Sequence, residues 1–193
     1  MIQKKTKLPM NLPNRLTLLR IAMIPLYLVL LTGNAGCRIG AALVFAAASI
    51  TDFFDGRIAR RRNLITDFGK FMDPIADKLL VLMPFIYFCA IEPFGTADVW
   101  PVMLMVAREI VVSGFRLVAS AQGSVIAADK FGKVKTAVQM CTVLALTLRP
   151  AIEPALPWFG TLCFVFLWVC GALALYSGVE MIVKNRRILE VEE

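Results

Sequence analysis

Residues 52–60 read DFFDGRIAR and residues 69–77 read GKFMDPIAD, and both stretches lie within long apolar segments. They contain four carboxylates, those of Asp52, Asp55, Asp73 and Asp77. A carboxylate in a hydrocarbon environment costs several kcal/mol unless a cation or a polar partner compensates it. The first two aspartates are three residues apart and the last two are four apart, so each pair lies on one face of a helix. Because an antiparallel hairpin brings such faces together, the stretches predict a membrane hairpin with a four-carboxylate cage.

The composition is that of a membrane protein. Hydrophobic residues make up 59% of the 193 residues, and the mean hydropathy is +0.72. A transmembrane helix needs about 20 mainly apolar residues, so the chain has room for about six with short loops. We therefore expect an all-α integral membrane protein, a single domain over residues 1–193, with six transmembrane helices after a short interfacial segment around residues 10–15. The six helices are expected at about 17–32, 38–61, 68–91, 98–121, 131–149 and 157–183.

The positive charge of the chain, formally +7, gathers in alternate loops and at both ends. The residues concerned are Lys4, Lys5, Lys7, Arg15 and Arg20, which flank the first predicted helix, and Arg60, Arg61, Arg62, Lys70, Lys130, Lys133, Lys135, Lys184, Arg186 and Arg187. Under the positive-inside rule, both termini and these loops face the cytoplasm. Because these residues lie at membrane boundaries rather than on an accessible folded surface, we expect no nucleic-acid partner. The chain has no histidine and no Cys-x-x-Cys pair, which excludes a zinc site and a histidine general base.

The oxygen ligands of four aspartates suit a hard cation such as Mg²⁺ or Mn²⁺. Magnesium usually shares its coordination sphere with substrate phosphates, and two ions about 4 Å apart can assist a phosphoryl displacement. With no histidine available, a carboxylate must serve as general base, and Asp77 or Asp73 is the candidate. Two other interpretations stay open on charge alone. The aspartates could pair with Arg57, Arg60 and Lys78 to stabilise the hairpin, or they could line a cation pathway in a transporter.

The complete pattern from Asp52 to Asp77, D-x2-D-G-x2-A-R-x8-G-x3-D-x3-D, resembles the signature of the CDP-alcohol phosphotransferase family, and all its defined positions agree. Three further segments are similar to the bacterial phosphatidylglycerophosphate synthase branch of that family. They read NLPNRLTLLR at 11–20, AREI at 107–110 and FGKVKTAVQM at 131–140. The likeness therefore covers most of the chain.

This resemblance implies transfer of a phosphatidyl group from CDP-diacylglycerol to the 1-hydroxyl of sn-glycerol 3-phosphate, with release of CMP. It also implies six transmembrane helices with an amphipathic N-terminal helix, a homodimer among membrane lipids, and a cytoplasmic active site at the bacterial inner (cytoplasmic) membrane. Two divalent cations, Mg²⁺ or Mn²⁺, would be bridged by Asp52 and Asp73. Asp55 would complete the first metal site, and Asp77 would complete the second and deprotonate the acceptor hydroxyl. Contacts with the CDP-lipid are implied for Asn14, Thr17, Gly56, Arg60 and Thr66.

Glycerol 3-phosphate is a dianion, so its pocket needs cations of its own. Arg108 and Arg116 lie within the fourth predicted helix, and Lys133 and Lys135 open the fifth. Glu109 lies seven residues before Arg116, on nearly the same face, and is expected to orient it. Membrane topology alone also accounts for the two lysines, whereas arginine deep in a transmembrane helix is rare. The alternatives are a related enzyme that uses inositol phosphate or phosphatidylglycerol as acceptor, and a cation transporter.

Overall fold

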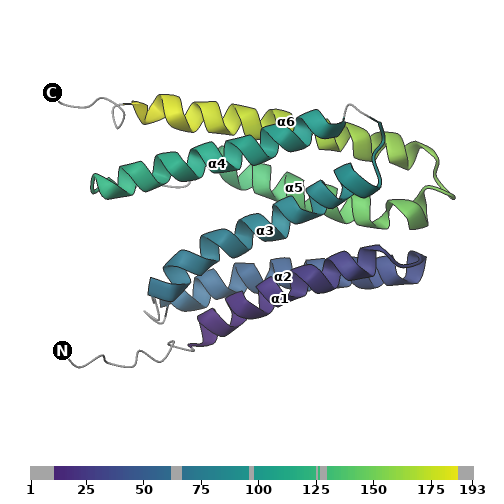
Figure 1. Ribbon diagram of the computed structural model, residues 1–193, viewed down its shortest axis with the longest axis horizontal. Helices are drawn as coiled ribbons and strands as arrows, with labels where there is room; N and C mark the ends of the chain where they lie inside the picture. The colour runs from purple at the N-terminus through teal and green to yellow at the C-terminus, as the bar shows by residue number, and fades with distance from the viewer. Residues whose placement is uncertain (1–10, 62–66, 96–97, 125, 127–129, 187–193) are drawn as a thin grey trace. The chain divides into compact units, whose positions relative to one another are not determined.

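The computed structural model describes residues 11–61, 67–95, 98–124, 126 and 130–186 (Figure 1). Side chains are described for these residues except 12, 13, 52–61, 67, 70 and 130. Over the described residues the chain forms helices and no strand, which confirms the all-α fold. The helices are α1 (Leu12–Leu31), α2 (Ala35–Arg61), α3 (Asp67–Ile91), α4 (Val99–Ala121), α5 (Lys130–Ile152) and α6 (Trp158–Lys184).

Three of these helices are long and apolar enough to cross a membrane by themselves, judged on the described residues. Their apolar stretches are Asn14–Leu31 in α1, Phe71–Ile91 in α3 and Trp158–Lys184 in α6. Large apolar side chains such as Val29 and Leu117 are also exposed on the outer faces of the helices, as expected for contact with lipid. The chain is therefore an all-α membrane protein, and the number of six membrane crossings stays a prediction.

The interfacial segment expected around residues 10–15 is not a separate element where the structure describes it. Residues 12–15 form the first turn of α1, which continues without interruption to Leu31. Pro13 is tolerated there because the first backbone N–H groups of a helix have no partner within the helix. Pro13 lies within this segment and does not interrupt the helix. Residues 1–10 lie outside the described part of the chain.

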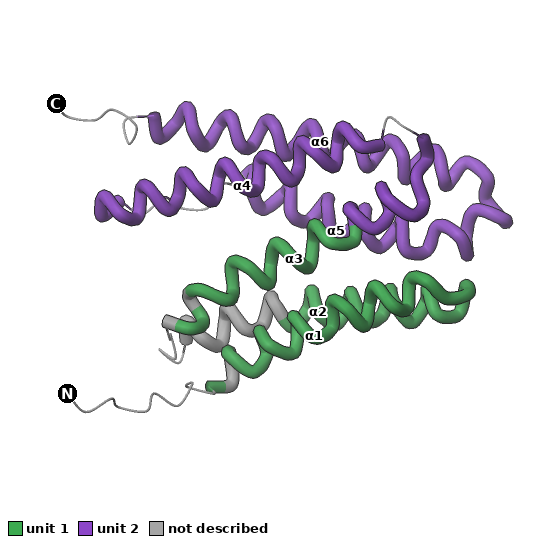
Figure 2. Tube along the Cα trace, in the orientation of Figure 1, with its two compact units in different colours: residues 1–84 green, residues 85–193 purple. Residues whose placement is uncertain are grey.

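The chain divides into two compact units, residues 1–84 and residues 85–193 (Figure 2). The division falls at Pro84, inside α3, where a proline removes one hydrogen bond from the helical ladder. The expected single domain stays a prediction.

In the first unit, α1 and α2 lie side by side (Figure 1). The rings of Tyr27 in α1 and Phe45 in α2 are 5.5 Å apart between centroids and inclined at 45°. Ala41 and Ala48 of α2 are buried near this pair and have small side chains. Small residues allow helices to approach closely in a membrane, where packing rather than the exclusion of water drives their association.

In the second unit, α6 packs against both α4 and α5. Two glycines of α6 mark the points where α4 comes closest. A Cβ atom added at Gly171 would lie 2.9 Å from the Cα atom of Pro101, and one added at Gly178 would lie 2.9 Å from Cγ of Arg108. These glycines are seven residues apart and so share one face of α6. On the α5 side, the Thr142 hydroxyl lies 3.3 Å from the Cys170 sulfur.

Candidate functional site

Two side chains of α1 bond directly to two predicted metal ligands of α3 in the first unit. The Thr17 hydroxyl donates a hydrogen bond of 2.7 Å to Oδ1 of Asp73. The Arg20 guanidinium donates through Nη1 to Oδ1 of Asp77, at 2.5 Å. The donors are three residues apart on α1 and the acceptors four apart on α3, so one face of each helix supplies both contacts. The sequence spacing predicted the shared face of α3, and the structure adds its partner on α1.

These contacts fix the carboxylates while leaving them accessible. The Arg20 side chain is only 1% exposed, whereas the Asp77 side chain is 53% exposed. Thr17 is also buried and Asp73 exposed. A charged hydrogen bond is shorter and stronger than a neutral one, so Arg20 holds Asp77 firmly on the α1 side. The carboxylate pair is therefore oriented by α1 while it stays exposed, an arrangement that suits binding of a cation.

Arg20 contacts a predicted site residue and was not itself predicted to belong to the site. It was grouped with basic residues flanking the first predicted helix, although it lies one turn beyond Thr17 on the same face. The signal was present, because an arginine inside an apolar helix needs a partner. Of the three alternative partners considered for the aspartates, Arg57 and Arg60 have side chains outside the described part, and Lys78 follows Asp77 on α3 with a partly exposed side chain.

The other half of the predicted cage is on α2, which continues to Arg61 and so includes both of its aspartates in its last turns. The side chains of Asp52 and Asp55 are not described. Among the described side chains, no three or more His, Cys, Asp and Glu residues converge on a point. The four-carboxylate cage therefore stays a prediction. Asp73 and Asp77 suit a divalent cation because their carboxylates offer hard oxygen ligands and are exposed.

The residues predicted to bind the CDP-lipid are only partly visible. Asn14 is buried one turn before Thr17 on α1, so the two share a face. Thr17 donates its hydroxyl proton to Asp73, which links the predicted lipid contacts to the predicted metal ligands. Gly56 and Arg60 are described only as part of the α2 backbone, and Thr66 lies outside the described residues. The role of this group in lipid binding stays a prediction.

A cluster of charged side chains joins α4 to α5 in the second unit. Oε1 of Glu109 accepts a hydrogen bond of 3.0 Å from Nη1 of Arg108 and a second one from Nζ of Lys135. The cluster is mostly buried, since the side chains of Glu109, Arg108 and Lys135 are 13%, 10% and 6% exposed. Two of the four predicted acceptor-binding cations are thus brought together.

The remaining two predicted acceptor residues, Arg116 and Lys133, are exposed. Glu109 was expected to orient Arg116 because the two share a face of α4. The structure shows contacts of Glu109 with Arg108, its neighbour in sequence, and with Lys135 of another helix, and the orientation of Arg116 by Glu109 stays a prediction. Spacing along one helix cannot reveal a partner on a second helix, which is why Lys135 was not foreseen in this contact.

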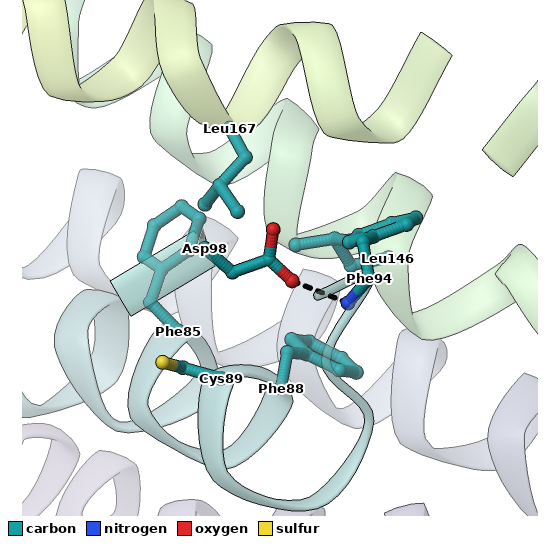
Figure 3. A pocket seen from close by; sticks show the side chains of 7 residues that line it. All are labelled: Phe85, Phe88, Cys89, Phe94, Asp98, Leu146 and Leu167. Carbon is teal, nitrogen blue, oxygen red and sulfur yellow. Dashed lines mark hydrogen bonds between the residues drawn. The ribbon is translucent and has the colours of Figure 1, made fainter. Parts of the chain in front are cut away.

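Two cavities in the second unit lie away from these residues. One, of about 10 Å³, is lined by Asp98 and by apolar side chains, three of them phenylalanines (Figure 3). Asp98 accepts hydrogen bonds from the backbone N–H groups of Phe94 and Gly95, the first of which Figure 3 draws. This cavity is too small for a substrate, and Asp98 there closes the turn between α3 and α4. The other, of about 320 Å³, is lined by Glu153, Gly160 and apolar neighbours. No predicted site residue lines either cavity.

Comparison with known proteins gives consistent matches over nearly the whole chain. The family model described as CDP-alcohol phosphatidyltransferase matches residues 10–176, across both compact units. A Bacillus subtilis (strain 168) protein named CDP-diacylglycerol–glycerol-3-phosphate 3-phosphatidyltransferase is 39% identical, over 93% of this chain and 97% of that protein. Proteins of the same name from Rickettsia felis and Shigella flexneri serotype 5b are 38% and 36% identical, over 87% and 91% of this chain and 91% and 95% of their own lengths.

Proposed function

Because the chain belongs to the CDP-alcohol phosphatidyltransferase family, we propose that it transfers a phosphatidyl group from CDP-diacylglycerol to sn-glycerol 3-phosphate and releases CMP. In this reaction the 1-hydroxyl oxygen of the acceptor bonds to the phosphatidyl phosphorus. The bond from that phosphorus to the CMP oxygen breaks, and CMP leaves as the anion. The names of the relatives support this acceptor, and they match this chain over most of its length.

The observation that carries the proposal is the pairing of Asp73 with Thr17 and of Asp77 with Arg20. Family members generally require divalent cations, and Asp52, Asp55, Asp73 and Asp77 would hold two of them, Mg²⁺ or Mn²⁺. Bound there, these cations would neutralise charge on the diphosphate and on departing CMP. The contribution of Thr17 and Arg20 is to keep the two α3 carboxylates oriented before substrate arrives.

Asp77 is our candidate for the general base. A base must reach the proton that it removes, and the exposed side of the Asp77 carboxylate makes this possible. Arg20 limits the rotation of the carboxylate by holding one of its oxygens. The proton of the acceptor hydroxyl would pass to Asp77 as the new phosphorus–oxygen bond forms. Direct attack of this kind needs no separate protein nucleophile.

The two substrates would be held by separate groups of residues. Asn14, Thr17, Gly56, Arg60 and Thr66 are proposed to contact the CDP-lipid. The phosphate of the acceptor would be bound by Arg108, Arg116, Lys133 and Lys135. We further infer, from the family resemblance, a homodimer in the bacterial inner membrane. The distribution of basic residues supports an orientation with the active site and both termini on the cytoplasmic side.

The test is release of CMP by the purified protein in mixed micelles of detergent and CDP-diacylglycerol. Parallel reactions receive glycerol 3-phosphate, inositol phosphate or phosphatidylglycerol, with Mg²⁺ or Mn²⁺ and with or without EDTA. Release that depends on glycerol 3-phosphate and stops with EDTA supports the proposal. Release with another acceptor would retain the family reaction and refute the acceptor. No release with any acceptor, together with metal uptake into proteoliposomes, would favour a transporter.

A further inference from the structure

The charged cluster of Arg108, Glu109 and Lys135 holds two cations against a single carboxylate, a charge imbalance that helix packing alone does not require. Two buried cations side by side repel each other, and each charge removed from water costs several kcal/mol unless it is paired. Glu109 pairs with both cations through a single oxygen atom. With two positive charges and one negative charge, the cluster keeps a net charge of +1. It can therefore still attract an anion.

Arg108 also has one N–H donor that these contacts do not use. Among the described residues, its Nε atom is buried without a hydrogen-bond partner. Buried N–H groups are nearly always bonded, so an orphaned one calls for an explanation, and a ligand oxygen supplies one. The stem of Arg108 rests against Gly178 of α6, where a Cβ atom would come within 2.9 Å of Cγ. The close packing of α6 at Gly178 therefore restricts the position of the Arg108 side chain.

We propose that Glu109 is a positioning residue, which holds Arg108 and Lys135 side by side so that both cations can bind the phosphate group of the acceptor. The inference rests on the proposed function, which makes a phosphate monoester the ligand of these cations. Glu109 would not touch the phosphate itself, because two anionic groups repel. Its effect passes through the two side chains that it orients.

The direction of the effect separates positioning from a simple change of charge. Removing a negative charge near a dianion strengthens the attraction of the remaining cations, so charge alone predicts a lower KM for glycerol 3-phosphate. Loss of positioning predicts the opposite. Two long, flexible side chains would then have to be ordered by the ligand, and that entropic cost weakens binding.

The test is the Glu109→Gln variant, assayed for CMP release while each substrate is varied in turn. We expect the KM for glycerol 3-phosphate to rise about tenfold or more, because the neutral amide replaces the charged partner of two largely buried cations, whose mutual repulsion is then no longer compensated. The KM for CDP-diacylglycerol and the kcat at saturating acceptor should stay within about twofold, since the lost interaction concerns acceptor binding. Thermal unfolding of the same preparation reports any loss of structure.

The matched control is Glu153→Gln. Glu153 is also a glutamate of the second unit paired with an arginine, since it accepts a 2.9 Å hydrogen bond from Nε of Arg149. That pair is more exposed and includes no predicted substrate ligand. We expect Glu153→Gln to leave both KM values unchanged.

A binding measurement keeps the inference independent of turnover. Inorganic phosphate should raise the unfolding temperature of the wild-type protein and of Glu153→Gln, and should raise that of Glu109→Gln much less. If wild-type protein shows no turnover with glycerol 3-phosphate, the proposed function fails, and the phosphate shift still decides the role of Glu109. An equal phosphate shift in the two glutamine variants would overturn the inference. An unchanged or lower KM for glycerol 3-phosphate in Glu109→Gln, or an equal rise in both KM values, would also overturn it.

Discussion

Replacing Asp77 by asparagine and by alanine separates its chemical role from its structural one. Both changes remove the carboxylate that we propose as metal ligand and general base. General base catalysis typically contributes about 10²–10⁴-fold, so each variant should lose at least about 10²-fold in CMP release. Asparagine keeps a carbonyl oxygen where Oδ1 of Asp77 accepts the hydrogen bond from Arg20, whereas alanine leaves the buried guanidinium without that acceptor.

The structure sets the size of the difference in stability. A hydrogen bond to a charged group contributes about 1.5–3 kcal/mol when buried. Asp77 is 53% exposed, so water screens the pair and we reduce this to about 1–2 kcal/mol. For a chain of this size, 1 kcal/mol corresponds to about 2–4 °C in Tm. Asp77→Ala should therefore unfold about 2–8 °C below the wild type, and Asp77→Asn within about 2 °C of it.

The assay is thermal unfolding of the three proteins in one detergent with EDTA present, so that bound metal does not contribute. Lys184→Gln serves as the control, because Lys184 forms an exposed pair with Glu180 one turn away, and such pairs contribute only about 0.3–0.5 kcal/mol. Equal stability of the alanine and asparagine variants would refute a stabilising role for the Arg20–Asp77 pair. Substantial turnover in Asp77→Asn would remove Asp77 as the base.

Three further outcomes are expected. Thr17→Val removes the hydroxyl that bonds Asp73 and should lower kcat/KM by about tenfold, the effect of one hydrogen bond to a charged group, while wild-type values would argue against orientation by α1. Gly171→Ala forces α6 away from the Pro101 backbone and should destabilise the protein by about 1–3 kcal/mol. Gly114→Ala is the control, because the space around Gly114 is open and its unfolding temperature should not fall. Equal unfolding temperatures of the two variants would contradict the close approach of α6 to α4. Removal of metal with EDTA should abolish CMP release and leave the far-UV circular dichroism unchanged, since the described ion pairs and helix packing require no cation.

The helices could be predicted from sequence because each corresponds to one long apolar run between polar or proline-containing loops. The fourth helix was expected at about 98–121 and is observed at Val99–Ala121. The first helix was predicted less well, because residues 10–15 were expected to form a separate interfacial segment before a helix at about 17–32, whereas α1 runs from Leu12 to Leu31. A proline in a first helical turn interrupts no hydrogen bond, so the position of Pro13 alone could not decide between these structures.

The candidate site was predictable only as far as the periodicity of single helices allows. The spacing of Asp73 and Asp77 indicated their shared face, but the periodicity of α3 holds no information about which residues of α1 lie opposite. Arg20 is 57 residues from its partner in sequence, and Lys135 is 26 residues from Glu109. Such contacts depend on how helices pack against each other, which composition and spacing along one helix do not determine.

The packing of α6 against α4 and α5 has a consequence for biosynthesis. The ribosome completes α4 and α5, which contain Arg108, Glu109 and Lys135, before it makes the more apolar α6. A charged helix enters a bilayer poorly unless a neighbour shields its charges. The Arg108–Glu109–Lys135 contact can partly shield the charges of α4 and α5. The packing of Arg108 against Gly178, however, forms only after α6 has been translated. The cations that we propose to bind the acceptor would then be set in place late in translation, so a nascent chain stalled before α6 should be an early substrate for membrane quality-control proteases.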